Sequence, residues 1–237
     1  MNTLYVLPVG ETLGKAWDTT KGSKKSFWAA LALLFLIAVG IGILQGIAKS
    51  LLPPLGFAIV IIGQLIIFLL QIGLLYMGIQ RAAGSPISYR LMFRTFDMNL
   101  ASRIITYYIL QMLILILPAI LIFLAALLSH AYPDIPGMSI LVAAFYVVGG
   151  AGFLYLSIRM MMGMAFVLDK AANPWEAVKS SFQITRGNFW SLLFLLIAQF
   201  IIFTISAIPF GIGLIWTLPF IFVLYGTIYK GLLLNLN

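Results

Sequence analysis

The sequence predicts an all-α integral membrane protein with six transmembrane helices, built as three repeats of an interfacial amphipathic helix followed by a transmembrane hairpin. Three observations support this fold class. The chain of 237 residues is 63% hydrophobic and only 8% charged, whereas soluble domains carry about 25% charged residues. It contains six long apolar stretches, and short basic segments separate them in pairs. We therefore expect one membrane domain that covers residues 1–237.

The six predicted spans follow one another in tight hairpins. A bilayer core about 30 Å thick needs about 20 apolar residues for each helical crossing. The stretches that meet this condition run, within a few residues, over Phe27–Ala48, Leu55–Gln80, Ile104–Ser129, Met138–Leu168, Phe189–Ile208 and Gly213–Leu234. Alternation of apolar and polar residues, which is typical of a transmembrane barrel, is absent from the sequence, so helices are the expected spanning structure. The first stretch is longer than the apolar part of a cleavable signal, and we expect it to stay in the protein.

The basic residues predict the orientation of the spans. Of the 14 lysines and arginines, 12 lie before the first span, between the second and third, between the fourth and fifth, or near the C-terminus. Only Lys49 lies on the other side, and Arg159 is inside the fourth span. Because basic residues favour the cytoplasmic side, both termini are predicted to be cytoplasmic. The net charge of +8 then indicates contact with a membrane surface, and it does not favour a nucleic-acid partner.

Weak internal similarity divides the chain into three approximate repeats, residues 8–80, 81–168 and 169–237. A shift of 89 residues places Asn99 on Asn188. With a three-residue insertion, the pair Phe27-Trp28 aligns with the pair Phe189-Trp190. Matches at fixed offsets outside the apolar spans indicate a repeated unit.

The third repeat predicts how each unit begins. Asn173 is a suitable N-cap, and Pro174 suits the first position of a helix. Gly187 can end that helix, whose polar face carries Lys179 and Arg186. A helix of this length is too short to span the bilayer, so we expect it to lie among the lipid headgroups with its apolar face toward the membrane.

The first two repeats are expected to begin in the same way, around Glu11 in the first and at Ser85-Pro86 in the second. Basic residues bind lipid phosphates, and tryptophans favour the boundary between the headgroups and the hydrocarbon core. We therefore predict a lipid headgroup interface made by Lys24, Lys25, Arg90, Arg94, Lys179, Arg186, Trp28, Trp175 and Trp190.

Five polar residues are predicted inside the spans. A charge such as Arg159 at membrane depth marks a functional site by default. The fourth span is also long enough for the Arg159 side chain to reach the cytoplasmic surface. The other four side chains either line a polar path or form hydrogen bonds between helices; they are Gln64, Gln71, Gln111 and Gln199.

The sequence offers few groups for catalysis. It has no cysteine and one histidine. His130 and Asp134 share a predicted outer loop, but two such residues do not complete a metal site or a catalytic triad. We expect no cofactor, no metal ion and no enzymatic activity.

One stretch, from Arg159 to Leu196, reads RMMMGMAFVLDKAANPWEAVKSSFQITRGNFWSLLFLL. It resembles the signature of uncharacterised bacterial inner-membrane proteins of the YciC type. It is also similar to the membrane domain that precedes the catalytic domain in some glycerophosphoryl diester phosphodiesterases. The resemblance implies a six-span fold in the bacterial inner (cytoplasmic) membrane and no established activity. We expect no phosphodiesterase activity, because the sequence contains no soluble catalytic domain.

Two functions remain open at this stage. The first is a non-enzymatic membrane protein that interacts with or organises anionic lipids or partner proteins. The alternative is a small transporter or lipid flippase with a polar site at mid-membrane depth. The repeats and the prolines inside the spans, Pro118 and Pro219, are typical of that second class. A homo-oligomer is compatible with both, and the sequence does not identify a protein partner.

Overall fold

The computed structural model describes residues 5–132, 135–208 and 210–236, and over these residues helices are the only regular elements. Six of them are long and apolar enough to cross a membrane, which confirms the predicted fold class at this level. They are α2 Lys24–Leu51, α3 Pro53–Ala82, α4 Met98–Ala131, α5 Met138–Met160 with its continuation α6 Gly163–Lys170, α8 Phe189–Ala207 and α9 Leu214–Leu232. The shorter elements are α1 Val9–Thr20, the 3₁₀ helix η1 Tyr89–Phe96, α7 Pro174–Ile184 and the 3₁₀ turn η2 Leu233–Leu236.

The start of α7 follows the predicted capping. The Asn173 side chain accepts a hydrogen bond from the Trp175 N–H at 3.3 Å, and Pro174 occupies the first helical turn. Gly187 then has a φ of +77°, a conformation that favours glycine after a helix end. The local sequence therefore determines both ends of this segment.

The second short helix differs from the expectation. It begins at Tyr89 instead of Ser85-Pro86, and it is a 3₁₀ helix. The Ser85 N–H bonds the Gln80 carbonyl at the end of α3, and the Ser26 hydroxyl of α2 donates to the Ile87 carbonyl at 2.9 Å. These two bonds hold the intervening segment against α2 and α3, so the helix starts only after it.

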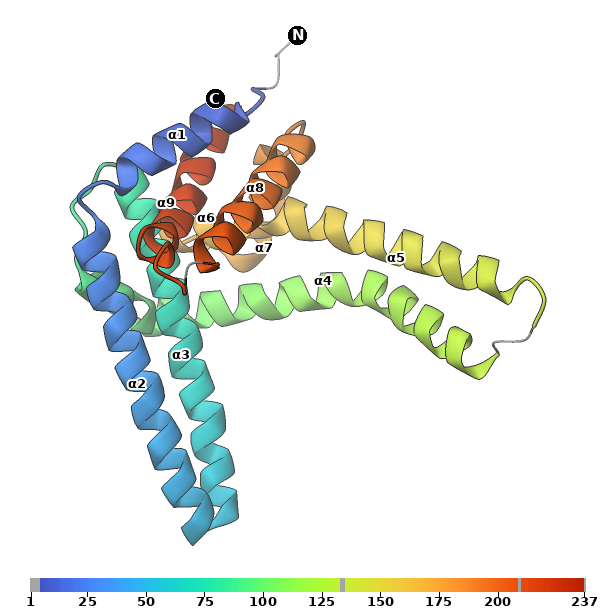
Figure 1. The fold of residues 1–237 in the computed structure, drawn as a ribbon, viewed down its shortest axis with the longest axis horizontal. Coiled ribbons are helices and arrows are strands. Elements are labelled where there is room, and N and C mark those ends of the chain that lie inside the picture. Colours follow the sequence, from blue (N-terminus) through green and yellow to red (C-terminus); the bar gives the residue numbers. More distant parts are fainter. Residues whose placement is uncertain (1–4, 133–134, 209, 237) are drawn as a thin grey trace.

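Two long hairpins extend from a central body. Helix α2 packs along α3, and α4 packs along α5, and the two pairs leave the body in clearly different directions (Figure 1). Helices α8 and α9 make fewer contacts with each other than these pairs do. Helix α9 instead packs against α3 and α1, so it belongs to the body.

The core of the body lies where the ends of α3, α6 and α9 meet. Half of the residues in the 18-residue apolar stretch of α9 are buried, compared with 11% of those in the corresponding stretches of α2, α4 and α8. The buried side chains come mainly from the second half of α3, from α6 and from α9, and include Leu70, Met77, Phe166, Phe220 and Tyr229. The outer parts of the hairpins remain exposed, as expected for helices that face lipid.

The three short helices each cover a different core helix. Helix α1 packs on α9, η1 packs on α3, and α7 packs on α6. The apolar face of α7, which we expected to rest on the membrane, is therefore largely covered by protein: Val178 and Ile184 are buried, and only Trp175 stays exposed. The cause is that the apolar side chains at the end of α6 pack against this face of α7.

Candidate lipid-binding surface

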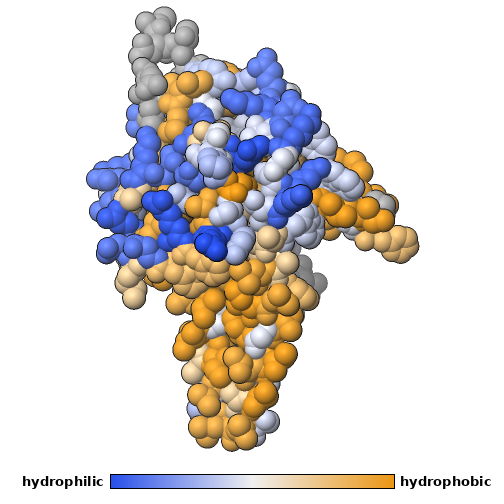
Figure 2. Space-filling model, turned by 90° about the vertical axis from the view of Figure 1, so that its left-hand side faces the viewer, coloured by the Kyte–Doolittle hydropathy of each residue, from blue (hydrophilic) through white to orange (hydrophobic). Residues whose placement is uncertain are grey.

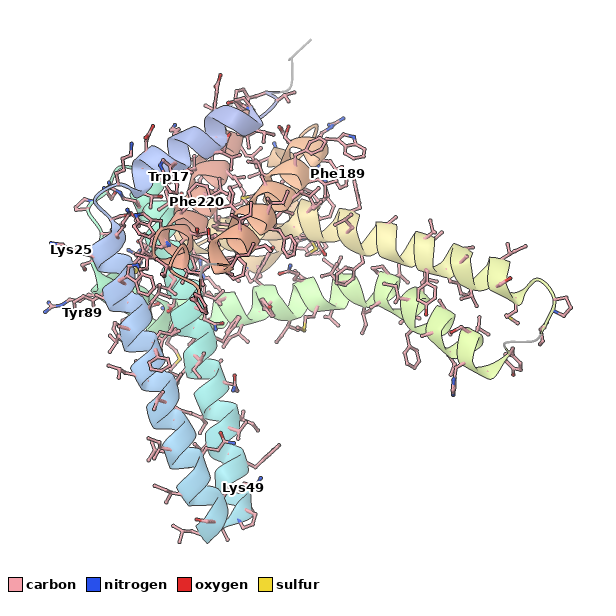
Figure 3. All side chains as sticks on the ribbon, in the orientation of Figure 1. Trp17, Lys25, Lys49, Tyr89, Phe189 and Phe220 are labelled. Atoms are coloured by element: carbon pink, nitrogen blue, oxygen red, sulfur yellow. The ribbon has the colours of Figure 1, made fainter. Side chains whose placement is uncertain are left out.

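The polar residues gather at one end of the molecule, which we call the basic end. It consists of α1, η1 and α7, the first turns of α2 and α4, and the last turns of α3, α6 and α9. Figure 2 shows hydrophilic residues over this end and an apolar hairpin below it. Lys25 and Tyr89 lie at the basic end, whereas Lys49 lies at the far tip of the α2–α3 hairpin (Figure 3).

Most cations of the basic end have no carboxylate partner. Within the described part of the chain, ion pairs join only Lys21 to Asp18 and Lys230 to Asp169. None of the six cations that we predicted at the headgroup interface takes part in these pairs; they are Lys24, Lys25, Arg90, Arg94, Lys179 and Arg186. Five of the six are exposed, and Lys24 is half-buried. Their charge is therefore available to an anionic ligand.

Aromatic rings accompany these cations. The Lys179 ammonium lies 5.5 Å from the centre of the Trp175 ring. Trp175 and Trp190 are 52% and 67% exposed. Trp28 differs, because it is half-buried and its indole N–H donates to the Ile215 carbonyl of α9 at 3.0 Å. Two of the three predicted tryptophans are thus exposed, and the third connects two helices.

A polar pocket of about 550 Å³ lies between η1, the start of α4 and the end of α6. Arg94 and Arg103 are among the residues that line it. The Arg94 guanidinium carbon lies 5.1 Å from the centre of the Tyr76 ring, and Arg103 donates a hydrogen bond to the Ala171 carbonyl. One guanidinium group can donate two parallel hydrogen bonds to the oxygens of a phosphate, so the arginines of this pocket are suitable donors for a phosphate group.

The two carboxylates of the pocket already have partners. Asp97 accepts a hydrogen bond from the Leu100 N–H at 3.0 Å and thereby caps α4. Asp169 accepts from the Lys230 ammonium at 2.9 Å and from the Tyr229 hydroxyl at 3.3 Å. The lining carries two arginines and two aspartates. Arg94 has no carboxylate partner among the described residues, so its guanidinium is the cation left to pair with a phosphate.

Sequence reasoning missed Arg103 and Asp169 as site residues. Arg103 follows Asn99 by four positions, which places both on one face of α4, and both line the pocket. This spacing was a usable signal. Asp169 comes to the pocket through the packing of α6, which no local pattern reveals.

Arg159 lies in the last turn of α5, beside α7. Its guanidinium donates to the Phe182 carbonyl at 2.6 Å and lies 5.1 Å from the centre of the Phe182 ring. The Ser181 hydroxyl in turn donates to the Arg159 carbonyl at 2.7 Å. The Nε atom of Arg159 is buried without a hydrogen-bond partner in the described structure. Arg159 thus connects α5 to α7 by several contacts, and this geometry fits the interpretation in which the side chain reaches the polar end of its helix.

The four glutamines come from three helices. Gln64 and Gln71 are exposed on α3, and Gln111 on α4 and Gln199 on α8 are half-buried. Over the described residues, no side-chain hydrogen bond joins any of them to another span. Of the four, only Gln71 lines the apolar groove of about 430 Å³ between α2, α3, α4 and α9.

His130 is exposed near the end of α4, and Asp134 lies outside the described residues. No cluster of three or more metal-ligating side chains occurs in the part of the chain that the structure describes. The fold and the site define a multi-pass helical membrane protein with one strongly basic end. Comparison with known protein families, with curated proteins and with solved structures gives no match for this chain.

Proposed function

We propose that this protein is a non-enzymatic, multi-pass protein of the bacterial inner membrane, and that its basic end binds the headgroups of anionic phospholipids. The observation that carries the proposal is the set of exposed cations without carboxylate partners at the end from which the apolar hairpins extend. Each basic residue near an anionic membrane surface contributes about 1 kcal/mol to binding. The location in the inner membrane, with cytoplasmic termini, rests on the charge distribution and on the resemblance of residues 159–196.

The proposal includes the threefold repeat of a headgroup-level helix and an apolar hairpin. Contacts between the repeats support it, because they follow a cyclic order: α1 of the first repeat packs on α9 of the third, η1 of the second on α3 of the first, and α7 of the third on α6 of the second. If the three segments were similar only because apolar helices align by chance, their short helices would have no reason to pack in this cyclic order. The cations of each repeat then surround a common core.

Native mass spectrometry of the detergent-extracted protein tests the function. The key variant carries Arg90→Gln, Arg94→Gln, Lys179→Gln and Arg186→Gln, all at exposed positions. We expect it to retain anionic phospholipid at least about tenfold less than the wild-type protein, because four surface charges are lost. Unchanged retention would refute the proposal.

The matched control replaces cations that the proposal does not use. Lys21 is paired with Asp18, and Lys49 lies at the far tip of α2. The double variant Lys21→Gln and Lys49→Gln should retain lipid as the wild-type protein does. A third variant, Arg159→Leu, separates the two functions that the sequence leaves open. Loss of a bound molecule only in Arg159→Leu would favour the transporter instead.

A further inference from the structure

The α8–α9 hairpin differs from the other two in the composition of its tip. The tips of the first and second hairpins carry Lys49 and His130. By contrast, no Asp, Glu, Lys, Arg or His occurs from Phe189 to Tyr229. The described residues of the third tip are Ile208, Phe210, Gly211 and Ile212, and the Phe210 side chain is fully exposed. A tip that emerges into water on the far side of a membrane does not favour such residues.

The position of this hairpin relative to α2 is fixed by direct contacts. The Trp28 indole N–H donates to the Ile215 carbonyl at 3.0 Å, and the Lys24 ammonium lies 5.2 Å from the centre of the Trp216 ring. Lys24 and Trp28 form the first turns of α2, at the basic end. The start of α9 therefore lies at the level of the basic end, although a sixth span that crosses the bilayer would start at the opposite face.

The length of chain beyond this point is too short to reach the opposite face. Phe210 precedes Trp216 by six residues, and six fully extended residues cover at most about 22 Å. The hydrocarbon core is about 30 Å thick. Helix α2, in comparison, continues from Trp28 to Leu51, a distance of about 35 Å at 1.5 Å per residue. The first hairpin can thus cross the core, and the tip of the third cannot.

The hydroxyl groups near this tip are satisfied inside the hairpin. Thr204 donates to the Phe200 carbonyl at 2.9 Å, and Ser206 donates to the Ile202 carbonyl at 2.7 Å. The Ser206 hydroxyl also bonds the Thr217 hydroxyl, which connects α8 to α9. Internal pairing of polar groups is required where lipid replaces water.

We infer that α8 and α9 form a re-entrant hairpin, whose apolar tip lies among the acyl chains of the leaflet next to the basic end. The first hairpin then crosses the membrane, and the third hairpin enters and leaves on one side. The termini stay on the same side, in agreement with the charge distribution. The inference rests on the part of the proposed function that places the basic end at the headgroups, and it does not depend on lipid specificity.

Because the chain has no cysteine, single cysteines can report which side each tip faces. The test variants are Phe210→Cys and Ile212→Cys. The references are Lys25→Cys at the basic end and Ser50→Cys at the tip of the first hairpin, both exposed in the structure. Each is labelled with a membrane-impermeant maleimide in sealed vesicles of both orientations, and again after detergent is added.

We expect Lys25→Cys and Ser50→Cys to react in opposite vesicle orientations. Phe210→Cys and Ile212→Cys should react about tenfold more slowly than either reference in both orientations, because a thiol in hydrocarbon does not ionise to the reactive thiolate. Detergent should restore their reaction, which also shows that the variants are intact. Quenching of a fluorophore at position 212 by brominated lipids should confirm its depth.

Three results would overturn the inference. Reaction at position 210 or 212 in the same orientation as Ser50→Cys would show a hairpin that crosses the membrane. Reaction in the same orientation as Lys25→Cys would place the tip in water. Absence of quenching by brominated lipids would show that position 212 does not contact acyl chains. Failure of the proposed function alone gives a different pattern, in which lipid retention is unchanged in the four-site glutamine variant while the labelling is as expected.

Discussion

The carbonyl group of Gly78 in α3 occupies the space where a side chain on Gly226 of α9 would begin. A Cβ on Gly226 would lie 2.7 Å from the Gly78 carbonyl carbon, closer than real Cβ contacts. A Cβ on Gly78 would likewise overlap the backbone of Phe222. Small residues at a crossing let two helices approach until their backbones touch. This pair of glycines therefore sets the closeness of α3 and α9 in the core.

Replacement of Gly226 by alanine should separate the two helices. We expect Gly226→Ala to lower the free energy of unfolding by about 1–3 kcal/mol, as inserted methyl groups do in a packed core. Thermal unfolding in detergent micelles measures this change. The control is Gly46→Ala in α2, where the added methyl group meets no atom within 4 Å, and where alanine favours the helix. Equal stability of Gly226→Ala and the wild-type protein would contradict the proposed close crossing.

The ion pair between Asp169 and Lys230 should contribute to the attachment of α6 to α9. The two side chains are only 17% and 28% exposed, and their atoms are 2.9 Å apart. Lys230→Gln leaves a largely buried carboxylate with a weaker partner, so we expect a loss of about 1–3 kcal/mol. A double-mutant cycle with Asp169→Asn isolates the pair, and detergent unfolding gives the free energies.

The exposed pair between Lys21 and Asp18 serves as the control for this cycle. It has a similar N–O distance, 2.7 Å, but both side chains are about 70% exposed. Water screens such a pair, so Lys21→Gln should leave stability unchanged. If the two lysine variants behave alike, burial does not determine the strength of the first pair.

Arg159 should hold α7 against α5. Its hydrogen bond to the Phe182 carbonyl involves a charged donor, and loss of such a bond costs about 1.5–3 kcal/mol. We expect Arg159→Leu to reduce the hydrogen-exchange protection of the amides of α7 by about tenfold or more. Arg186→Leu removes an exposed cation just after α7 and should leave that protection unchanged. Equal protection in Arg159→Leu and the wild-type protein would show that the contact is not needed for docking.

The sequence predicts the helices well because hydropathy and caps are local properties. The fifth predicted span, Phe189–Ile208, agrees within one residue with α8. The third span begins six residues before the predicted Ile104, because Asp97 caps α4. Hydropathy does not detect such a cap, since the residues that follow it are partly polar.

The sequence does not reveal how the helices pack. Apolar side chains suit lipid and protein equally, so the composition of α9 does not show that half of it is buried in the core. For the candidate site, the exposed cations follow from charge and spacing. The pocket around Arg94 needs the end of α6 as well, and Arg103 reaches it by bonding the carbonyl of Ala171, which is distant in sequence.

Asn188 illustrates a residue whose role becomes clear only in the structure. It was notable in the sequence as the match of Asn99, but its side chain is buried and binds the N-terminal segment. Its Oδ1 atom accepts from the Leu7 N–H at 2.6 Å, and its Nδ2 atom donates to the Tyr5 carbonyl at 2.8 Å. Both bonds join the side-chain amide of Asn188 to backbone atoms of residues 5–7. The interaction therefore does not depend on which side chains these residues carry.

Replacement of Asn188 should therefore release this segment from α8 and α9. Asn188→Ala leaves the buried Leu7 N–H without a partner, which costs about 1–3 kcal/mol. We expect the segment before α1 to become sensitive to protease, while Asn99→Ala, at the exposed matching position, leaves it protected. Asn188→Asp keeps the acceptor for Leu7 but not the donor for Tyr5, so its sensitivity should be intermediate. Equal cleavage of the wild-type protein and the three variants would show that the two Asn188 side-chain bonds do not hold the N-terminal segment.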